Sequence, residues 1–105
     1  MILDFLKKLL GGGASQKIKE LYENGAIIVD VRTEGEYGRG HINNSINVPL
    51  HELSGALAKL KKQDKTIITC CQSGRRSGMA AQQMNAAGIK AVNGGGWASL
   101  RRIIA

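Results

Sequence analysis

The sequence predicts an α/β domain in which helices flank a central parallel sheet. Short runs rich in β-branched residues alternate along the chain with longer segments of helical periodicity, and parallel strands need such long crossovers. The chain has 105 residues and is 43% hydrophobic but only 4% aromatic. A single core of Ile, Leu, Val and Ala therefore suits a sheet layered with helices.

The first ten residues predict a short helix with one apolar side. That side holds Ile2, Phe5, Leu6, Leu9 and Leu10. GGGA then predicts a flexible break, so we expect 1–14 to be an amphipathic segment with a Gly-rich linker and 15–105 to be the folded domain. One reading of this segment is a docking helix or a frayed tail. The other is an anchor to a membrane surface or to a partner.

A helix and a strand follow the glycine run. Ser15 is expected to cap the helix, and Gly25 to close it in the left-handed conformation. The next residues, AIIVDV at 26–31, form a short apolar run rich in β-branched residues. This run predicts a buried strand.

The middle of the chain predicts a loop, a strand and a helix. Residues 33–44 are polar and punctuated by glycine, which indicates a loop, with one helical turn at 34–37. A second short strand is expected at 45–49, where proline ends the pairing. Leucines at helical intervals over 50–60 then predict a helix.

The last part of the chain predicts two more strands, each followed by a helix. TIITC at 66–70 is the third expected strand, and the helix after it begins near Ser77 and stops at Gly88. AVN at 91–93 is the fourth strand, and 97–105 predict the last helix.

The end of the third strand carries the candidate reactive group, Cys71, because ligands of parallel sheets bind beyond the carboxyl ends of strands. The expected loop after it consists of Gln72, Ser73, Gly74, Arg75 and Arg76. A glycine at positive φ lets successive N–H groups converge, and a helix N-terminus adds its dipole. Together with the arginines, these donors favour a thiolate, which is a nucleophile at neutral pH.

The neighbouring Cys70 lies within the apolar strand, where we expect it to act as a small buried hydrophobe. Adjacent cysteines do not form an ordinary disulfide, because its Cα atoms lie farther apart than neighbours do. Both cysteines are therefore expected to be thiols.

Three motifs give the chain a resemblance to the rhodanese homology domain. CQSGRRS at 71–77 has the C-x-x-G-x-R-S form of the single-domain sulfurtransferases. IIVDVRTEGEYGRGHINNSINVP at 27–49 is similar to the family's D-V-R…E-Y…G-H-I…N-x-P signature, and VNGGGW at 92–97 to its glycine and tryptophan motif. The resemblance runs from about Ser15 to Trp97. It implies a three-layer rhodanese-like fold with four to five parallel strands.

The resemblance also implies a thiosulfate sulfurtransferase-like enzyme. Cys71 would carry sulfane sulfur as a persulfide, taken from a small anionic donor such as thiosulfate and passed to cyanide, a thiol or a protein. The amides of 72–76 would stabilise the negative charge, and Arg76, with Arg75 beside it, would neutralise the donor's sulfonate. No metal or organic cofactor is expected.

Five upstream and downstream residues are expected to support the site and to take no part in the chemistry. Asp30, Arg32 and Glu36 are expected to brace the loops by hydrogen bonds and ion pairs. The resemblance gives His41 a structural role, and Trp97 is expected to join the glycine run in a close-packed turn under the active loop.

Two departures from the family pattern affect these expectations. The two-domain thiosulfate enzymes have basic residues at the positions of Glu36 and Ser73, so thiosulfate is expected to be a convenient donor and a protein or low-molecular persulfide the physiological one. Family members also usually show a short strand before the first helix. Here that edge strand is either missing or borrowed from 1–10.

Two rival functions stay open. Counted from Cys70, the motif has the C-x5-R spacing of cysteine phosphatases and arsenate reductases, although the glycine then follows Cys71 by three positions and Cys70 would be buried. The other rival is a non-catalytic sulfur-carrier or binding module, whose basic loop docks an acidic partner.

The net charge of +7 favours anionic partners. Nucleic acid is not expected, because the basic residues are scattered and few aromatic residues can stack on bases. No secretory signal or membrane span is recognisable, so we expect a cytoplasmic protein. The sequence leaves the oligomeric state open.

Overall fold

A computed structural model of the chain, which describes residues 12–105, contains one sheet of four strands in the order β2-β1-β3-β4. The strands are β1 (Ile27–Asp30), β2 (Ile46–Asn47), β3 (Ile67–Cys71) and β4 (Ala91–Gly96). All three neighbouring pairs run parallel. The predicted α/β fold with a central parallel sheet is confirmed.

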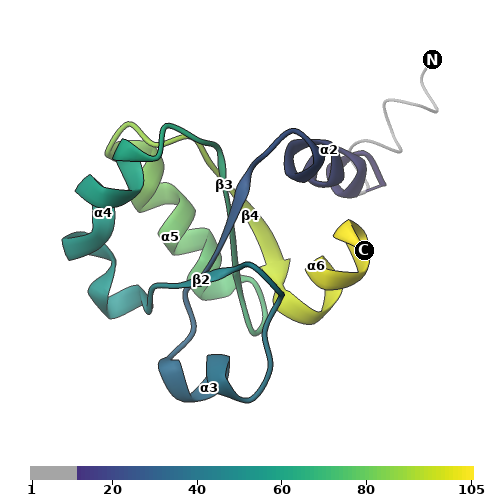
Figure 1. Ribbon diagram of the computed structural model, residues 1–105, viewed down its shortest axis with the longest axis horizontal. Helices are drawn as coiled ribbons and strands as arrows, with labels where there is room; N and C mark the ends of the chain where they lie inside the picture. Colours follow the sequence, from purple (N-terminus) through teal and green to yellow (C-terminus); the bar gives the residue numbers. More distant parts are fainter. Residues whose placement is uncertain (1–11) are drawn as a thin grey trace.

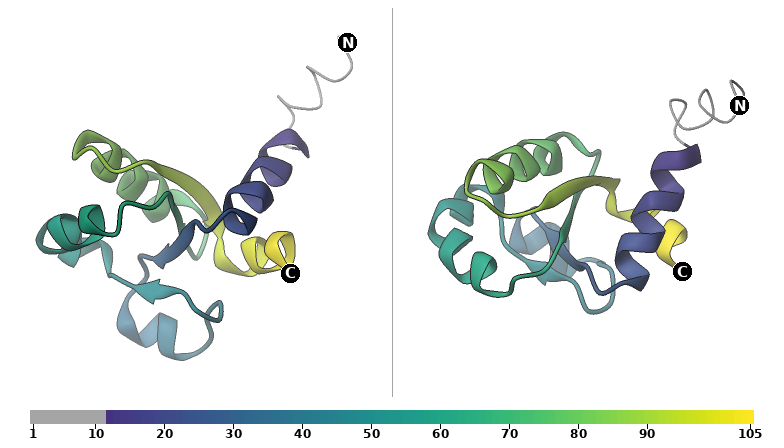
Figure 2. Two further views of the ribbon diagram at one scale, coloured as in Figure 1. Left: turned by 45° about the horizontal axis from the view of Figure 1, so that its top comes forward. Right: turned by 90° about the horizontal axis from the view of Figure 1, so that it is seen from above.

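Helices cover both faces of this sheet (Figure 1 and Figure 2). The helices α4 (Leu53–Lys62) and α5 (Arg75–Ala86) lie on one face. The helices α2 (Gly12–Glu23) and α6 (Trp97–Ile104) lie on the other. The short α3 (Glu34–Gly38) joins β1 to β2, and a 3-10 turn (Leu50–Glu52) precedes α4. Every crossover between parallel strands therefore contains a helix.

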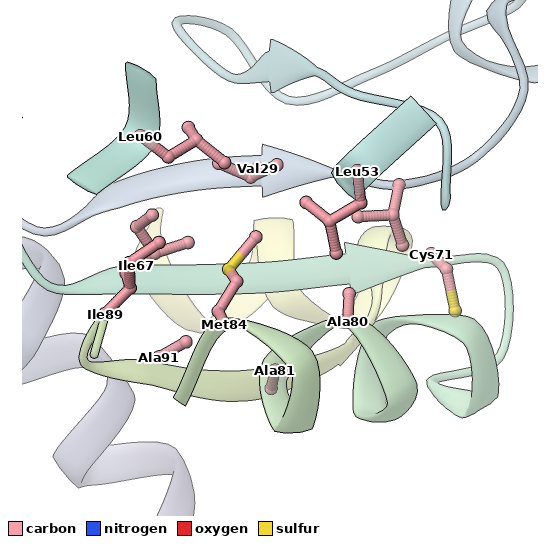
Figure 3. Packing of buried hydrophobic residues seen from close by; sticks show 11 residues of the cluster. Val29, Leu53, Leu60, Ile67, Cys71, Ala80, Ala81, Met84, Ile89 and Ala91 are labelled. Atoms are coloured by element: carbon pink, nitrogen blue, oxygen red, sulfur yellow. The ribbon is translucent and has the colours of Figure 1, made fainter. Parts of the chain in front are cut away.

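Side-chain alternation along β3 divides the buried residues into two cores. Ile67 and Cys71 belong to the cluster under α4 and α5, together with Leu53 and Met84 (Figure 3). Ile68 and Cys70 point to the other face, where they form the second cluster with Ile28, Ile42 and Leu100. Successive side chains of a strand face opposite sides, so two adjacent cysteines are assigned to different layers.

The N-terminal boundary of α2 differs from the prediction. The helix begins at Gly12, so Ser15 lies inside it and does not cap it, and the predicted break at residues 12–14 is helical. Extending an existing helix adds one hydrogen bond per residue, which offsets the modest cost of placing glycine in it. The other end is as predicted, because Gly25 has a φ of +101°.

Two boundaries near the predicted reactive loop also differ. Helix α5 begins at Arg75 and not near Ser77, because Gly74 adopts a φ of +98° and caps it directly. Strand β4 continues to Gly96 and does not end at Asn93. The glycines allow this extension, since a Cβ on Gly94 would lie 2.7 Å from the carbonyl oxygen of Thr69.

Two expectations concern residues 1–10, which lie outside the described residues: the N-terminal helix and the alternative that this segment supplies an edge strand. None of the helices in this part of the chain is long and apolar enough to cross a membrane.

Candidate active site

The sulfur of Cys71 lies inside the turn that joins β3 to α5. Its side chain points from the strand end toward the loop before the helix (Figure 3). The Gly74 N–H donates to Sγ at 3.0 Å and the Ser77 N–H at 3.4 Å, and the Ser77 hydroxyl lies 3.3 Å away. The predicted convergence of main-chain donors on this sulfur is therefore present, although Ser77 contributes where the prediction ended at residue 76.

These donors decide the acidity of Cys71. Burial of the side chain raises the pKa, but hydrogen bonds from the Ser77 hydroxyl, the Ser77 N–H, the Gly74 N–H and the Ser73 N–H outweigh it. The pKa of Cys71 is consequently lowered below that of an ordinary thiol. Hydrogen bonds to the charged form favour that form.

Cys70 shows the opposite shift. Its side chain faces the α2 and α6 layer, where burial and then the nearby carboxylate of Asp30 raise its pKa to about 12. The C-x5-R register that starts at Cys70 therefore places its cysteine away from the loop.

The two predicted loop arginines differ in their surroundings. Arg76 forms a bidentate pair with Glu36 of α3, with N–O distances of 2.7 and 2.9 Å. The hydrogen bonds from Arg76 lower the pKa of Glu36 to about 2, so the pair stays charged at neutral pH. Arg75 is exposed in the first turn of α5. The Arg76 charge, which was expected to neutralise an anionic donor, is thus already paired with a carboxylate.

The Asp30–Arg32 pair braces the loops next to the site. Asp30 is fully buried and binds Arg32 at 2.7 Å, and Arg32 also donates to the carbonyl oxygens of Glu36 and Gly40. The Arg32 guanidinium lies 4.6 Å from the centre of the Trp97 ring. These contacts tie the end of β1, the α3 loop and the start of α6 together.

The glycine run at 94–96 packs directly against the loop. A Cβ on Gly74 would lie 3.2 Å from Gly95 Cα, and one on Gly96 would lie 2.8 Å from the carbonyl oxygen of Gln72. Only glycine, which has no Cβ, lets the two backbone segments approach so closely, so β4 packs directly against the turn. His41 lies outside this arrangement, since its exposed ring stacks on Tyr37 at 3.8 Å and binds that residue's carbonyl oxygen.

Two residues that were not among the expected site residues hold the turn around Cys71. Ser77 closes it with both its N–H and its hydroxyl, and Asn93 accepts the Ser77 hydroxyl at 2.7 Å. Asn93 also donates to the Gly74 carbonyl at 2.9 Å. The available signal for Asn93 was its place at the end of the predicted fourth strand, directly before the glycines, and this strand pairs with β3.

Two shallow depressions flank the loop. One of about 300 Å³ is lined by residues that include Arg39, Gln72 and Trp97. The other, about 260 Å³, is more apolar and includes Pro49 and Leu50. Glu36 lines the first and Arg76 the second, so their ion pair lies between them.

This geometry agrees with the family comparison, in which the profile of the rhodanese-like domain matches residues 14–100. The chain belongs to the rhodanese-like domain family. The match covers both the turn around Cys71 and the glycine run that packs against it. In residues 12–105 of this rhodanese-like domain, no group of three or more His, Cys, Asp or Glu side chains is placed to hold a metal ion.

Relatives of this rhodanese-like domain include a putative sulfur carrier protein, YrkF, of Bacillus subtilis. It is 42% identical over 65 residues, which cover 62% of this chain and 35% of that protein. The thiosulfate sulfurtransferase PspE of Escherichia coli is 30% identical over 69 residues, 65% of this chain and 66% of that protein. The chain thus spans less than two thirds of the length of each.

Solved structures share the fold. A rhodanese-like domain protein from Staphylococcus aureus is 32% identical and superposes with a TM-score of 0.66, over 72% of this chain and 74% of that one. The structure of reduced CoADR-RHD from Bacillus anthracis is 36% identical with a TM-score of 0.70. That comparison covers 86% of this chain and 16% of the other.

Proposed function

We propose that this protein is a sulfurtransferase that carries sulfane sulfur as a persulfide on Cys71. The observation that carries the proposal is the placement of Sγ within hydrogen-bonding distance of the Gly74 and Ser77 N–H groups. Such donors stabilise a thiolate before sulfur arrives and the negative charge of the donor and persulfide afterwards.

The proposed reaction has two displacements. The Cys71 thiolate attacks the outer sulfur of thiosulfate, the S–S bond breaks, and sulfite leaves with its electron pair. Cys71 then holds a persulfide. The lone pair of cyanide attacks the outer sulfur, the bond between the two sulfurs breaks, and thiocyanate leaves while the Cys71 thiolate is restored.

The physiological donor in this proposal is a protein or low-molecular persulfide. Thiosulfate is a dianion, and the Arg76 charge that would neutralise it is paired with Glu36. A persulfide donor carries less charge to be compensated. A thiol or protein is the proposed acceptor, and the cytoplasm stays the predicted location.

A sulfur-carrier function is the second candidate, supported by the similarity to a protein named as a putative sulfur carrier. A carrier would accept sulfur on the same Cys71 and release it only to its partner. A phosphatase is less well supported, because Cys70 faces the opposite layer and its pKa is raised to about 12 by burial.

Mass spectrometry of the protein after thiosulfate treatment tests the proposal. We expect one added sulfur on the Cys71 peptide, lost in Cys71→Ser and kept in the matched variant Cys70→Ser. Multiple turnovers of thiocyanate formation distinguish an enzyme from a carrier, which loads once. Absence of added sulfur on Cys71 with both thiosulfate and a persulfide donor would contradict the proposal.

A further inference from the structure

The hydroxyl proton of Ser77 has two acceptors within reach. Ser77 Oγ lies 2.7 Å from Asn93 Oδ1 and 3.3 Å from Cys71 Sγ. A serine hydroxyl has one proton and donates it to one acceptor at a time. The two contacts therefore compete.

The orientation of Asn93 fixes the direction of its bond to Ser77. Its Nδ2 donates to the Gly74 carbonyl oxygen at 2.9 Å, and its Oδ1 accepts from the Gly95 N–H at 2.9 Å. The amide group is thus held by two partners of opposite kind. Because Oδ1 can only accept, Ser77 must be the donor in the 2.7 Å contact.

The bond from Ser77 to Asn93, unlike the N–H donors around the sulfur, favours a protonated Cys71 over an ionised one. In the thiol form, S–H donates to Ser77 Oγ while Ser77 donates to Asn93, and every group is satisfied. In the thiolate form, Ser77 must turn its proton toward sulfur and leave Asn93, or else present oxygen lone pairs to a negative charge. Ionisation is therefore opposed by the short Ser77–Asn93 bond, which must break before the hydroxyl can stabilise the thiolate.

We propose that Asn93 is a positioning residue that sets how readily Cys71 ionises, by competing with its sulfur for the Ser77 hydroxyl proton. The consequence for sulfur transfer rests on the proposed function. Once sulfur is loaded, the negative charge lies on the outer atom, Sγ is neutral, and the Ser77 proton returns to Asn93. The bond would then alternate with each loading and release.

Other charged or titratable side chains near the turn do not enter this competition. They come from α5, α3 and the ends of β1 and β3, and in the described part of the chain none of their side chains hydrogen-bonds to Ser77 or Asn93. They belong to Arg75 and Arg76, Glu36, Asp30 and Arg32, and Cys70. A neutral substitution at Asn93 leaves all of them in place.

The test measures the ionisation of Cys71 by iodoacetamide labelling over a pH series, followed on the Cys71 peptide. Asn93→Leu is close in shape and removes the acceptor, which frees the Ser77 proton for sulfur. We expect the labelling midpoint to fall by roughly half to one pH unit, because a hydrogen bond to a charged group is stronger than one to a neutral group. Asn93→Asp, a stronger acceptor with a negative charge, should raise the midpoint.

Ser77→Ala provides the decisive control. If Asn93 acts through the hydroxyl, Asn93→Leu should leave the midpoint unchanged in a Ser77→Ala background. An equal shift in both backgrounds, or no fall in Asn93→Leu itself, would overturn the inference. Labelling needs no sulfur donor, so it stays readable even if persulfide formation fails.

Discussion

Cys70 and Cys71 are neighbours in the sequence and both are fully buried, yet they lie in two different regions of the molecule. Cys70 faces the layer of α2 and α6, among aliphatic side chains. Cys71 ends the same strand but faces the turn before α5, where N–H groups surround its sulfur. One step along a strand separates a thiol whose pKa is raised from a thiol whose pKa is lowered.

The difference teaches that burial alone does not set the reactivity of a thiol. Burial raises the pKa of both side chains. For Cys70, Asp30 acts in the same direction, whereas for Cys71 hydrogen bonds from Ser77 and Gly74 reverse the shift. What differs is the number of donors that a buried sulfur receives.

Selective labelling is the strongest way to break this comparison. At neutral pH we expect iodoacetamide to modify native Cys71 at least about a thousandfold faster than Cys70. The physical reason is the thiolate population, since the pKa of Cys70 is raised to about 12 while that of Cys71 is lowered below 9.0. Tandem mass spectrometry over a time course measures both rates, because fragment ions separate the two adjacent cysteines of the same peptide.

Denatured protein is the control for this labelling, because both cysteines should then react at similar rates. Equal rates in the native protein would show that local opening, and not the donors around Cys71, governs reactivity. Faster modification of Cys70 would contradict the assignment of the two layers.

The assignment of the two cysteines to different layers could be predicted because it depends on local order. A β-branched run ending in two cysteines, followed by glycine three positions after Cys71, fixes both the alternation and the turn. The helical state of residues 12–14 could not be predicted in this way. Glycine signals a break, but an adjoining helix can extend through it at small cost.

Gly74→Ala tests the donors around Cys71 with a smaller expected effect. Gly74 has a φ of +98°, and a Cβ would lie 3.2 Å from Gly95 Cα, so the turn must shift, and we expect this shift to weaken the bond from its N–H to Sγ. We expect Cys71 labelling at neutral pH to slow by roughly three- to tenfold, since a lost hydrogen bond to a charged group is worth about 1 kcal/mol or more. The labelling rate of Cys70 should not change.

Gly25→Ala is the matched control, because Gly25 has a similar φ of +101° and open space around its Cβ position. Both substitutions should lower the free energy of unfolding by about 1 to 2 kcal/mol through left-handed strain. Only Gly74→Ala should slow Cys71 labelling. If both variants slow it equally, the effect is global destabilisation and not loss of a donor.

The contacts between distant segments were beyond sequence reasoning. Glu36 and Arg76 lie 40 positions apart, and Asn93 lies 16 from Ser77. No periodicity or turn signal encodes such pairs, because they form only when α3, α5 and β4 meet. The same limit explains why Arg76 was expected to be free for an anionic donor.

Glu36→Gln tests the smallest effect, the neutralisation of Arg76 beside the reactive turn. Gln keeps the capping box in which the Glu36 side chain accepts from Thr33, so α3 should stay intact. The released charge on Arg76 should raise the rate of persulfide formation from thiosulfate about two- to fivefold, the range of a partly exposed ion pair. Labelling by neutral iodoacetamide should change less, because that reagent carries no charge for Arg76 to attract.

Glu34→Gln removes the same charge from the same helix turn without touching the Arg76 pair, so it should leave the thiosulfate rate near that of the native protein.

The pH dependence of the unfolding free energy gives an independent check on the Glu36–Arg76 pair. A carboxylate whose pKa is lowered from 4.5 to about 2 stabilises the fold above pH 4.5 and loses that contribution as the pH falls toward 2. The difference in unfolding free energy between native protein and Glu36→Gln should therefore vanish over this range. A gain in the thiosulfate rate shared by Glu36→Gln and Glu34→Gln would mean that net charge, and not Arg76, attracts the donor.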